Sequence, residues 1–338
     1  MDILTPKQLL FSESIIAKIG KKHDIMCTSR NYDEITKLAE IRNFNIIFVG
    51  KHGGSQKEAK LRDSTDRTKK LLKKIEVFSP EIVISFCSPE AARISFGLGI
   101  KHIAYCDSPH ASSVMRLTLP LIQKLLIPYY IPKKEFSRYG IDIKNIIQYK
   151  AIDAFVTMQR NIDETRKVPF KNKNKKNILI RLEEEEAAYA SKSNTIIPII
   201  KKIVKEHGNE NVVILGRYAN QIKNLKRIIG KKTKITKMAF DGKHLLNSAD
   251  IFIGSGGTMT AESALMGIPT ISYNAVPNRI EDFLVRKKLV KRETEPDRIS
   301  AQINKIFELS DTENKKRAGR IIREMEDPVQ KLMRIIKE

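Results

Sequence analysis

Short apolar stretches rich in β-branched residues alternate along the chain with longer stretches of helical periodicity. The short runs predict buried strands and the 3.6-residue repeats predict amphipathic helices between them. Strands are predicted at residues 1–4, 24–28, 45–49, 81–86, 102–106, 125–128 and 146–149, and again at 177–182, 212–215, 234–236, 251–253 and 270–273. Helices are predicted between them, for example at 8–19, 33–41, 57–77 and 89–98. The alternation predicts an α/β fold of parallel sheets with crossover helices.

The alternation of predicted strands and helices is interrupted by a polar and aperiodic segment at 167–176, with KNKNKK at its centre. This composition is typical of a linker. We therefore predict a Rossmann-like domain at 1–166, a linker at 167–176, and a second Rossmann-like domain with C-terminal helices at 177–338. Two such domains usually bind their ligand in a cleft at the carboxyl ends of the strands. The first strand is short for a central one, which leaves open whether it forms completely or starts upstream.

The charge distribution along the chain bears on whether the protein binds nucleic acid. The chain has 62 Lys and Arg against 39 Asp and Glu, a net charge of +23. Residues 1–170 carry 28 basic and 18 acidic side chains and the remainder carries 34 and 21, so the excess is spread over both halves. This spread favours a general surface bias over a dedicated nucleic-acid track, and we expect no specific nucleic-acid partner. A diffuse positive field would still attract anionic substrates or anionic lipid.

No run of eighteen apolar residues and no signal-peptide pattern is found in the sequence. The three cysteines, Cys27, Cys87 and Cys106, lie in or beside predicted strands without the spacing of a metal knuckle. They are typical of reduced core thiols. These features predict a cytoplasmic protein, either free or peripheral to a membrane.

The strongest chemical motif is ADIFIGSGGTMTAESALMGIPTISY at 249–273. An apolar strand runs into Gly254-Ser255-Gly256-Gly257, and Thr258 opens a helix. Glycines let a ligand approach the backbone, and the free amides at a helix start bind anions. Glu262, four residues after Thr258, could accept hydrogen bonds from a ribose diol. The alternative is a tight strand-to-helix turn with a solvated glutamate.

Within this stretch, GGTMTAESALMGIP resembles the donor-binding signature of GT-B proteins, which nucleotide-sugar glycosyltransferases and non-hydrolysing UDP-GlcNAc 2-epimerases share. The segments DILTPKQLLF, GKHGG, SPEAARISFGLGI, AYCDSPHA, RLTLPL, IPKKEF and LGRY resemble the archaeal family named domain of unknown function 354. The resemblance implies a GT-B-like fold whose two sheets face a central cleft. It also implies a ribose contact for Glu262 and phosphate contacts for Gly256, Gly257 and Thr258.

Two further clusters follow predicted strands of the first half. Asp107-Ser108-Pro109-His110 comes after the strand at 102–106, where Asp107 and His110 could act as a catalytic base and its orienting partner. The alternative is a Ser-Pro turn whose aspartate caps a helix. Gly50-Lys51-His52-Gly53-Gly54 could fold over a ligand, with Lys51 and His52 neutralising phosphate, or form an ordinary glycine-rich connection. The first turn, Thr5-Pro6-Lys7-Gln8, lacks the glycines and the catalytic histidine of many GT-B transferases.

In the second half, Arg181 and Arg217 each follow a predicted strand and could together clamp a pyrophosphate. Asp241 precedes another helix and could line the base or ribose pocket. The epimerases have a His-Arg-Arg-Glu stretch near the place of Arg181, whereas here a single arginine precedes Glu183. The run 183–186 is more typical of a solvated acidic cap than of a metal site, and no convincing metal-binding aspartate pair is found.

The predicted function is a metal-independent GT-B glycosyltransferase that uses a nucleotide sugar and no other cofactor. The resemblance implies that this sugar is linked to UDP. There are two alternatives. One is a sugar epimerase of the UDP-GlcNAc 2-epimerase type, and the other is a non-catalytic binder of nucleotide sugars or polyanions. Residues 115–139 mix apolar, aromatic and basic side chains. They could hold a lipid-linked or glycan acceptor at an anionic membrane surface, or simply form a core helix, a strand and a loop.

Overall fold

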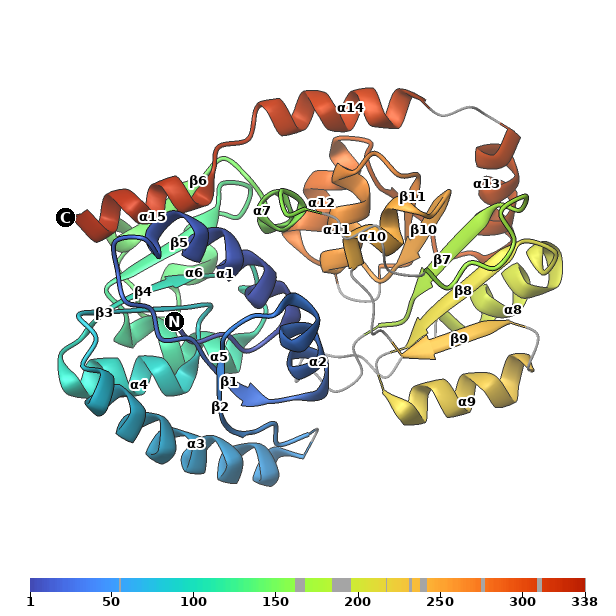
Figure 1. The fold of residues 1–338 in the computed structure, drawn as a ribbon. Coiled ribbons are helices and arrows are strands. Elements are labelled where there is room, and N and C mark those ends of the chain that lie inside the picture. Colours follow the sequence, from blue (N-terminus) through green and yellow to red (C-terminus); the bar gives the residue numbers. More distant parts are fainter. Residues whose placement is uncertain are drawn as a thin grey trace. The chain divides into compact units, whose positions relative to one another are not determined.

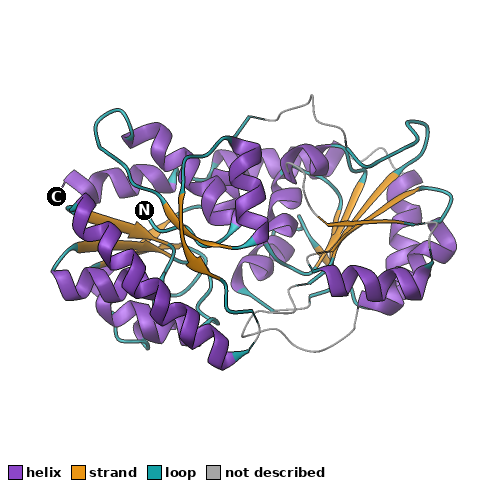
Figure 2. Cartoon of the chain, turned by 60° about the horizontal axis from the view of Figure 1, so that its bottom comes forward, coloured by secondary structure: helices purple, strands orange, loops and turns teal. Residues whose placement is uncertain are grey.

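The computed structural model describes residues 1–54, 56–161, 168–183, 196–216, 218–230, 233–237, 242–274, 277–308 and 312–337. The chain folds into two compact units (Figure 1). Unit 1 contains Met1–Arg160 and the C-terminal segment Met325–Glu338, and unit 2 contains most of the chain between them. Each unit is built on parallel strands with helices packed against them (Figure 2). The predicted α/β class with parallel sheets is confirmed.

The strands of unit 1 form a pair and a four-stranded sheet, both parallel. The pair consists of β1 (Thr28–Asn31) and β2 (Ile47–Lys51), and the larger sheet has the order β3 (Ile82–Ser85), β4 (Lys101–Tyr105), β5 (Lys124–Pro128) and β6 (Ile146–Tyr149). Asp2 bridges the two, because it pairs with Thr28 on one side and Ser85 on the other. The predicted first strand at 1–4 is therefore reduced to this single-residue bridge.

A buried ion pair stabilises this bridge. The guanidinium of Arg67 donates to both carboxylate oxygens of Asp2, at 2.5 and 3.2 Å, and to the carbonyl of Val49 at 3.1 Å. Asp2 also accepts from the hydroxyl of Thr28 at 2.7 Å. Burial alone would raise the pKa of Asp2, but the Arg67 charge and these hydrogen bonds lower it on balance. Two charges can be buried here because each has its partner and its hydrogen bonds.

The helices of unit 1 cover the strands on two sides. They are α1 (Pro6–Ile19), α2 (Asp33–Arg42), α3 (Lys57–Phe78), α4 (Pro89–Leu98), α5 (Ser112–Thr118), α6 (Lys134–Ser137), α7 (Asp153–Met158) and α15 (Pro328–Lys337). Leu9 of α1 and Ile35 of α2 share one core cluster, whereas Leu71 of α3 and Ile94 of α4 share another. The last helix, α15, packs beside α1 (Figure 1). The sequence predicted a second domain at 177–338 that includes this helix. In the structure α15 belongs to unit 1 instead.

Unit 2 contains a six-stranded parallel sheet. Its order is β12 (Lys291–Arg292), β11 (Thr270–Ser272), β10 (Ile251–Gly254), β7 (Asn177–Arg181), β8 (Asn211–Gly216) and β9 (Lys234–Lys237). The accompanying helices are α8 (Ile196–His207), α9 (Ala219–Ile229), α10 (Gly242–Asn247), α11 (Thr258–Leu265), α12 (Arg279–Arg286), α13 (Pro296–Glu308) and α14 (Thr312–Arg323).

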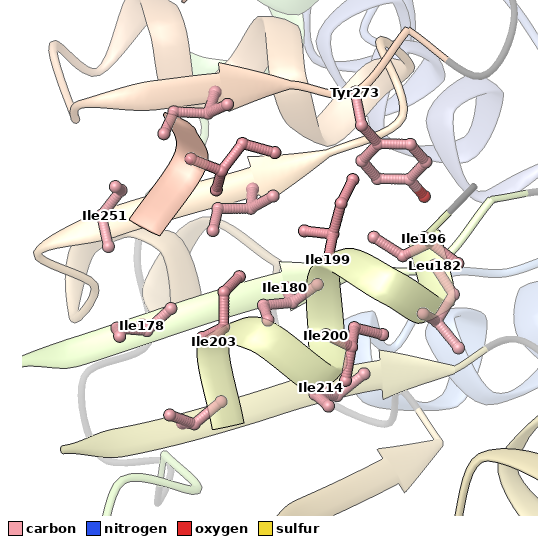
Figure 3. Close-up of a cluster of buried hydrophobic side chains, with 14 of the residues drawn as sticks. Ile178, Ile180, Leu182, Ile196, Ile199, Ile200, Ile203, Ile214, Ile251 and Tyr273 are labelled. Carbon is pink, nitrogen blue, oxygen red and sulfur yellow. The ribbon is translucent and has the colours of Figure 1, made fainter. Parts of the chain in front are cut away.

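Alternation along the strands of unit 2 places side chains on both faces of the sheet. Ile178 and Ile180 of β7 pack with one cluster, and Leu179 between them packs with the other. Figure 3 shows the first cluster, in which isoleucines of α8 meet those of the strands and Tyr273 lies at the carboxyl edge. Both faces of the central strands are apolar, as parallel sheets require. None of the described helices combines the length and apolar composition needed to cross a membrane.

Candidate functional site

The order of strands in unit 2 reverses between β7 and β10. From β7 the chain continues to β8 and β9 on one side, and then returns to β10, β11 and β12 on the other. Ile253 lies opposite Ile180 in the register, so Gly254 and Arg181 end their strands side by side. The carboxyl edge at such a reversal is where open α/β sheets bind ligands. Topology therefore brings two of the predicted site elements, Arg181 and the glycine turn, to the same edge.

The glycine turn has a backbone that other residues would strain. Gly256 has φ +90°, in the region that favours glycine. Its amide donates to the hydroxyl of Thr260 at 3.2 Å, and α11 begins two residues later, at Thr258. The first amides of a helix have no partner within the helix. Those of α11 therefore lie at the carboxyl edge of β10 and are suited to an anionic group.

Glu262 lies within α11 and is only 3% exposed. Its neighbours on the helix, Thr260 and Ser263, are equally buried. The reading of Glu262 as a solvated surface glutamate is therefore wrong. A carboxylate taken out of water needs hydrogen-bonding partners, and this is consistent with a structural or a ligand-binding role. The ribose contact remains a prediction.

Arg181 is buried, and its guanidinium donates to the carbonyl of Gly216, at the end of the adjacent β8, at 3.1 Å. Glu183 is also buried and accepts from the hydroxyl of Tyr273 at 2.7 Å. The expectation of a solvated acidic cap is therefore wrong for Glu183, which is part of the packed edge. Arg217 and Asp241, as well as 184–186, lie outside the described residues, so the proposed arginine clamp remains a prediction.

The corresponding cluster in unit 1 centres on Lys7. Its ammonium lies 2.7 Å from Oδ2 of Asp107 and 2.9 Å from Oδ2 of Asp153. The hydroxyl of Tyr149 donates to the other oxygen of Asp153 at 2.5 Å, and Ser108 donates to Asp107 at 2.8 Å. Asp153 is 3% exposed, whereas Lys7 and Asp107 are each about one fifth exposed, at 19% and 20%. Lys7 and Asp107 thus form the accessible side of the cluster, and Asp153 lies behind them.

The sequence explains why Lys7 is held in this place. Thr5 caps α1 by accepting from the amide of Gln8, and Pro6 occupies the first turn. The side-chain oxygen of Gln8 reaches back to accept from the amide of Leu4 at 2.6 Å. This reciprocal arrangement resembles a capping box and fixes the direction in which the first turn leaves the sheet.

The two carboxylates of the Lys7 cluster differ in proton affinity. Burial would raise the pKa of Asp107, but the Lys7 charge and the hydrogen bonds from Lys7 and Ser108 lower it. Burial raises the pKa of Asp153 more than Lys7 lowers it, and the negative charge of Asp107 adds to the rise. Burial lowers the pKa of His110, with Asp107 opposing this effect. Titratable groups whose pKa values are pushed apart are typical of acid–base sites, although ion-pair networks show them too.

Asp107 and His110 influence each other electrostatically, but the principal partner of Asp107 is Lys7, and the roles of Asp107 and His110 as base and orienting partner remain predictions. Sequence reasoning missed Lys7 and Asp153 as site residues. Both follow the end of a predicted parallel strand, at 1–4 and 146–149, so their position was a signal that could have identified them. Such ends share one edge of a sheet.

Lys51 ends β2 and is exposed, and His52 follows it in the loop that leads to α3. The ring of His52 lies 4.9 Å from that of Tyr32, and its Nδ1 accepts from the amide of Gly54 at 3.1 Å. A Cβ on Gly53 would lie 2.6 Å from Cα of Lys60. Gly53 therefore has a packing role, and phosphate binding by Lys51 and His52 remains a prediction. Among the described residues, no group of three or more His, Cys, Asp or Glu could hold a metal ion.

Comparison with solved structures identifies the fold. UDP-GlcNAc 2-epimerase from Neisseria meningitidis bound to UDP-GlcNAc matches with a TM-score of 0.74 and 16% identity, over 100% of both chains. The Methanocaldococcus jannaschii UDP-GlcNAc 2-epimerase in complex with UDP-GlcNAc and UDP matches with 0.64 and 17%, over 95% of this chain and 98% of that one. The glycotransferase of kitacinnamycin matches with 0.62 and 12%, over 99% and 97%. At these identities the likeness shows the fold alone, and the predicted GT-B-like fold is confirmed.

Sequence comparison identifies the family. An uncharacterized protein of Methanocaldococcus jannaschii is 27% identical over 297 residues, which are 85% of each chain. The family model described as "Protein of unknown function (DUF354)" matches residues 1–338. This is the family that the motifs of the sequence resemble. The chain belongs to the DUF354 family.

Proposed function

We propose that this protein is a nucleotide-sugar enzyme that changes the configuration of its sugar by proton transfer, as sugar epimerases do. The observation that carries the proposal is the contact of Lys7 with Asp107 and Asp153, two carboxylates of opposite pKa shift. Epimerisation at C2 of a nucleotide sugar requires a base that removes the C2 proton. The electron pair of that C–H bond forms a C1–C2 double bond while the C1–O bond to the nucleoside diphosphate breaks, so a cation is needed to stabilise the negative charge that develops on the departing oxygen. Return of a proton to the other face of C2 and of the diphosphate to C1 completes the change of configuration.

In this proposal each charged group has a separate role. Asp107 is accessible and has a lowered pKa, so it is ionised at neutral pH and acts as the base. Lys7 stabilises the developing charge, and its pKa is raised above its usual range because two carboxylates outweigh the effect of burial. Asp153 and Tyr149 lie behind Lys7 and orient its ammonium. His110 is neutral at pH 7 because its pKa is lowered.

Unit 2 supplies the nucleotide site in this proposal. The amides of Gly257 and Thr258 and the start of α11 receive the diphosphate, and Glu262 accepts from the ribose hydroxyls. This assignment is supported by the position of the glycine turn, which lies where the strand order reverses and beside the end of β7. The solved relatives with this fold include epimerases bound to UDP-GlcNAc. UDP-linked N-acetylglucosamine is therefore the first substrate to test.

One observation favours glycosyl transfer as the second candidate. Arg181-Leu182-Glu183 stands where the epimerases have a His-Arg-Arg-Glu stretch, so the histidine is missing. In a transferase Asp107 would deprotonate the acceptor hydroxyl instead of the sugar carbon. The lipid-linked or glycan acceptor expected from residues 115–139 belongs to this candidate.

Proton exchange separates the two reactions. The protein is incubated with UDP-GlcNAc in D₂O, and NMR follows deuterium at C2 of the sugar. We expect wild-type protein to introduce deuterium and Asp107→Asn to reduce the rate about 100-fold or more while UDP affinity stays within about twofold. Asp142→Asn, an exposed aspartate of the same unit, should behave as wild type.

Two outcomes contradict the epimerase proposal. UDP binding without any deuterium incorporation would favour the transferase or a non-catalytic binder. Full exchange in Asp107→Asn would remove Asp107 as the base and return its turn to a structural role.

A further inference from the structure

The glycine turn of unit 2 is held from behind by the first turn of α12. Asn278 caps that helix, since its Oδ1 accepts from the amide of Glu281 at 2.9 Å. The same side chain uses its Nδ2 to donate to the carbonyl of Gly256 at 3.1 Å. One amide group therefore connects the start of α12 to the middle of the glycine turn, and both of its ends are engaged.

Glu281 fills the space beside Gly256. Its carboxyl group is 1% exposed, and a Cβ built on Gly256 would lie 2.4 Å from Oε2 of Glu281. The hydroxyl of Ser272, at the end of β11, would lie 3.4 Å from the same Cβ. Glycine is thus required at 256 for two reasons, the positive φ and the glutamate behind it.

The negative charge of Glu281 is balanced by an arginine in β12. Arg292 in β12 donates to Oε1 of Glu281 at 3.2 Å and to Asp282 at 2.8 Å. Burial raises the pKa of Glu281, opposed by the Ser272 hydroxyl and by Arg292. The ion pair with Arg292 therefore reduces the negative field that Glu281 would otherwise exert on an anion bound at the turn.

We propose that Asn278 and Glu281 are positioning residues that fix the Gly256-Gly257 turn, so that the amides at the start of α11 already point toward the phosphates of a nucleoside diphosphate. The inference rests on the proposed function for the identity of the ligand. Two adjacent glycines have great conformational freedom. A turn that is ordered before binding loses less entropy when the phosphates arrive.

Asn278→Asp separates positioning from folding. Aspartate is as good an N-cap as asparagine, so it keeps the acceptor for the amide of Glu281. It cannot donate to the carbonyl of Gly256. We expect the affinity for UDP, measured by calorimetry, to fall at least about tenfold, the affinity for uridine to stay within about twofold, and the melting temperature to stay close to that of wild type. Because aspartate also adds a negative charge near the phosphates, Asn278→Ser serves as the neutral counterpart, since serine is also a good N-cap. We expect it to show the same selective loss of UDP affinity, whereas a merely structural residue would lower stability in this neutral variant without changing the ratio of the two affinities.

Hydrogen exchange in the ligand-free protein tests the same contact without nucleotide. Peptides covering residues 254–266 should exchange faster in Asn278→Asp and in Glu281→Ala than in wild type. Asp282→Asn is the matched control, because Asp282 shares Arg292 with Glu281 but is one residue further along α12. It should leave both exchange and UDP affinity unchanged.

Unchanged exchange in both test variants, or equal losses for UDP and uridine, would overturn the positioning role. If wild-type protein binds no nucleotide, the proposed function fails. The exchange measurement would then still decide whether Asn278 and Glu281 hold the turn.

Discussion

His102 is a neutral histidine enclosed in the core of unit 1. It is fully buried on β4, and its Nε2 lies 2.8 Å from the hydroxyl of Ser85 on the neighbouring strand. Nδ1 has no hydrogen-bond partner among the described residues. Burial lowers the pKa of His102 to about 4, because the charged imidazolium is disfavoured there even though Asp2 opposes the shift. An unfolded histidine has a pKa of about 6.5.

This difference predicts a pH dependence of stability. Between pH 6.5 and 4 the unfolded chain binds a proton at His102 and the native protein does not, so the free energy of unfolding falls as the pH falls. The full effect is about 3 kcal/mol. His102→Gln should remove this dependence, and denaturant unfolding of both proteins at pH 7 and pH 4.5 measures it. Equal slopes against pH in the two proteins would contradict the prediction.

Glu262 supports a prediction on ligand binding. If its carboxylate holds the ribose, Glu262→Ala removes one or two charge-assisted hydrogen bonds, each worth about 1.5–3 kcal/mol. UDP should then bind at least about tenfold more weakly, while uracil alone is unaffected. Calorimetry with the two ligands measures this. Unchanged UDP affinity would leave Glu262 with a structural role only.

Residue roles were only partly predictable from the sequence. The glycine turn and Asp107 could be found because glycines and an aspartate after a predicted strand are local signals. Lys7 follows a predicted strand, but it is one of many lysines, and its contacts with Asp107 and Asp153 span 100 and 146 residues. The burial of Glu183 and Glu262 also depends on which side chains surround them, and that is a tertiary property.

At the scale of elements, Gly267 shows how closely α11 and α14 pack. It follows α11 with φ +72°, and a Cβ there would lie 2.6 Å from Cα of Lys315 in α14. Gly230, also in unit 2, has φ +77° but nothing within 4 Å of its Cβ position. Both glycines therefore have a positive φ that strains other residues, but only at Gly267 would a side chain also clash with a neighbouring helix.

The pair predicts different costs for the same substitution. Gly230→Ala should cost about 1 kcal/mol, from backbone strain alone. Gly267→Ala should cost about 1–3 kcal/mol more, because the backbone of α14 must shift. Urea unfolding of both variants decides this, and equal destabilisation would mean that α14 moves at no cost.

Most helices and strands were predictable at this scale, since apolar runs and helical periodicity are local. The exact first and last residues of these elements were less predictable. The strand predicted at 24–28 is found as β1 (Thr28–Asn31), and its pairing with β2 is interrupted by a register shift between Ser29 and Asn31. Such a shift depends on how two strands pair, which the pattern of apolar and polar residues within one strand does not encode.

For the whole molecule, the net charge of +23 predicts weak and unspecific attraction to nucleic acid. Binding to duplex DNA should be largely lost by about 0.2 M salt, because it depends on counterion release. Fluorescence anisotropy with two unrelated duplexes at increasing salt measures this. Selective binding that survives 0.2 M salt would show that nucleic acid is a specific partner.

The affiliation of α15 with unit 1 has a consequence for the order of synthesis. Val329, Leu332 and Ile335 of α15 are buried, and the hydroxyl of Tyr105 donates to the carbonyl of Pro328 at 3.1 Å. A ribosome that has released residues 1–160 must still make all of unit 2 before this helix appears, which takes on the order of ten to thirty seconds. During that interval the nascent unit exposes the apolar surface that α15 later covers, and this exposed surface makes the incomplete chain prone to aggregation.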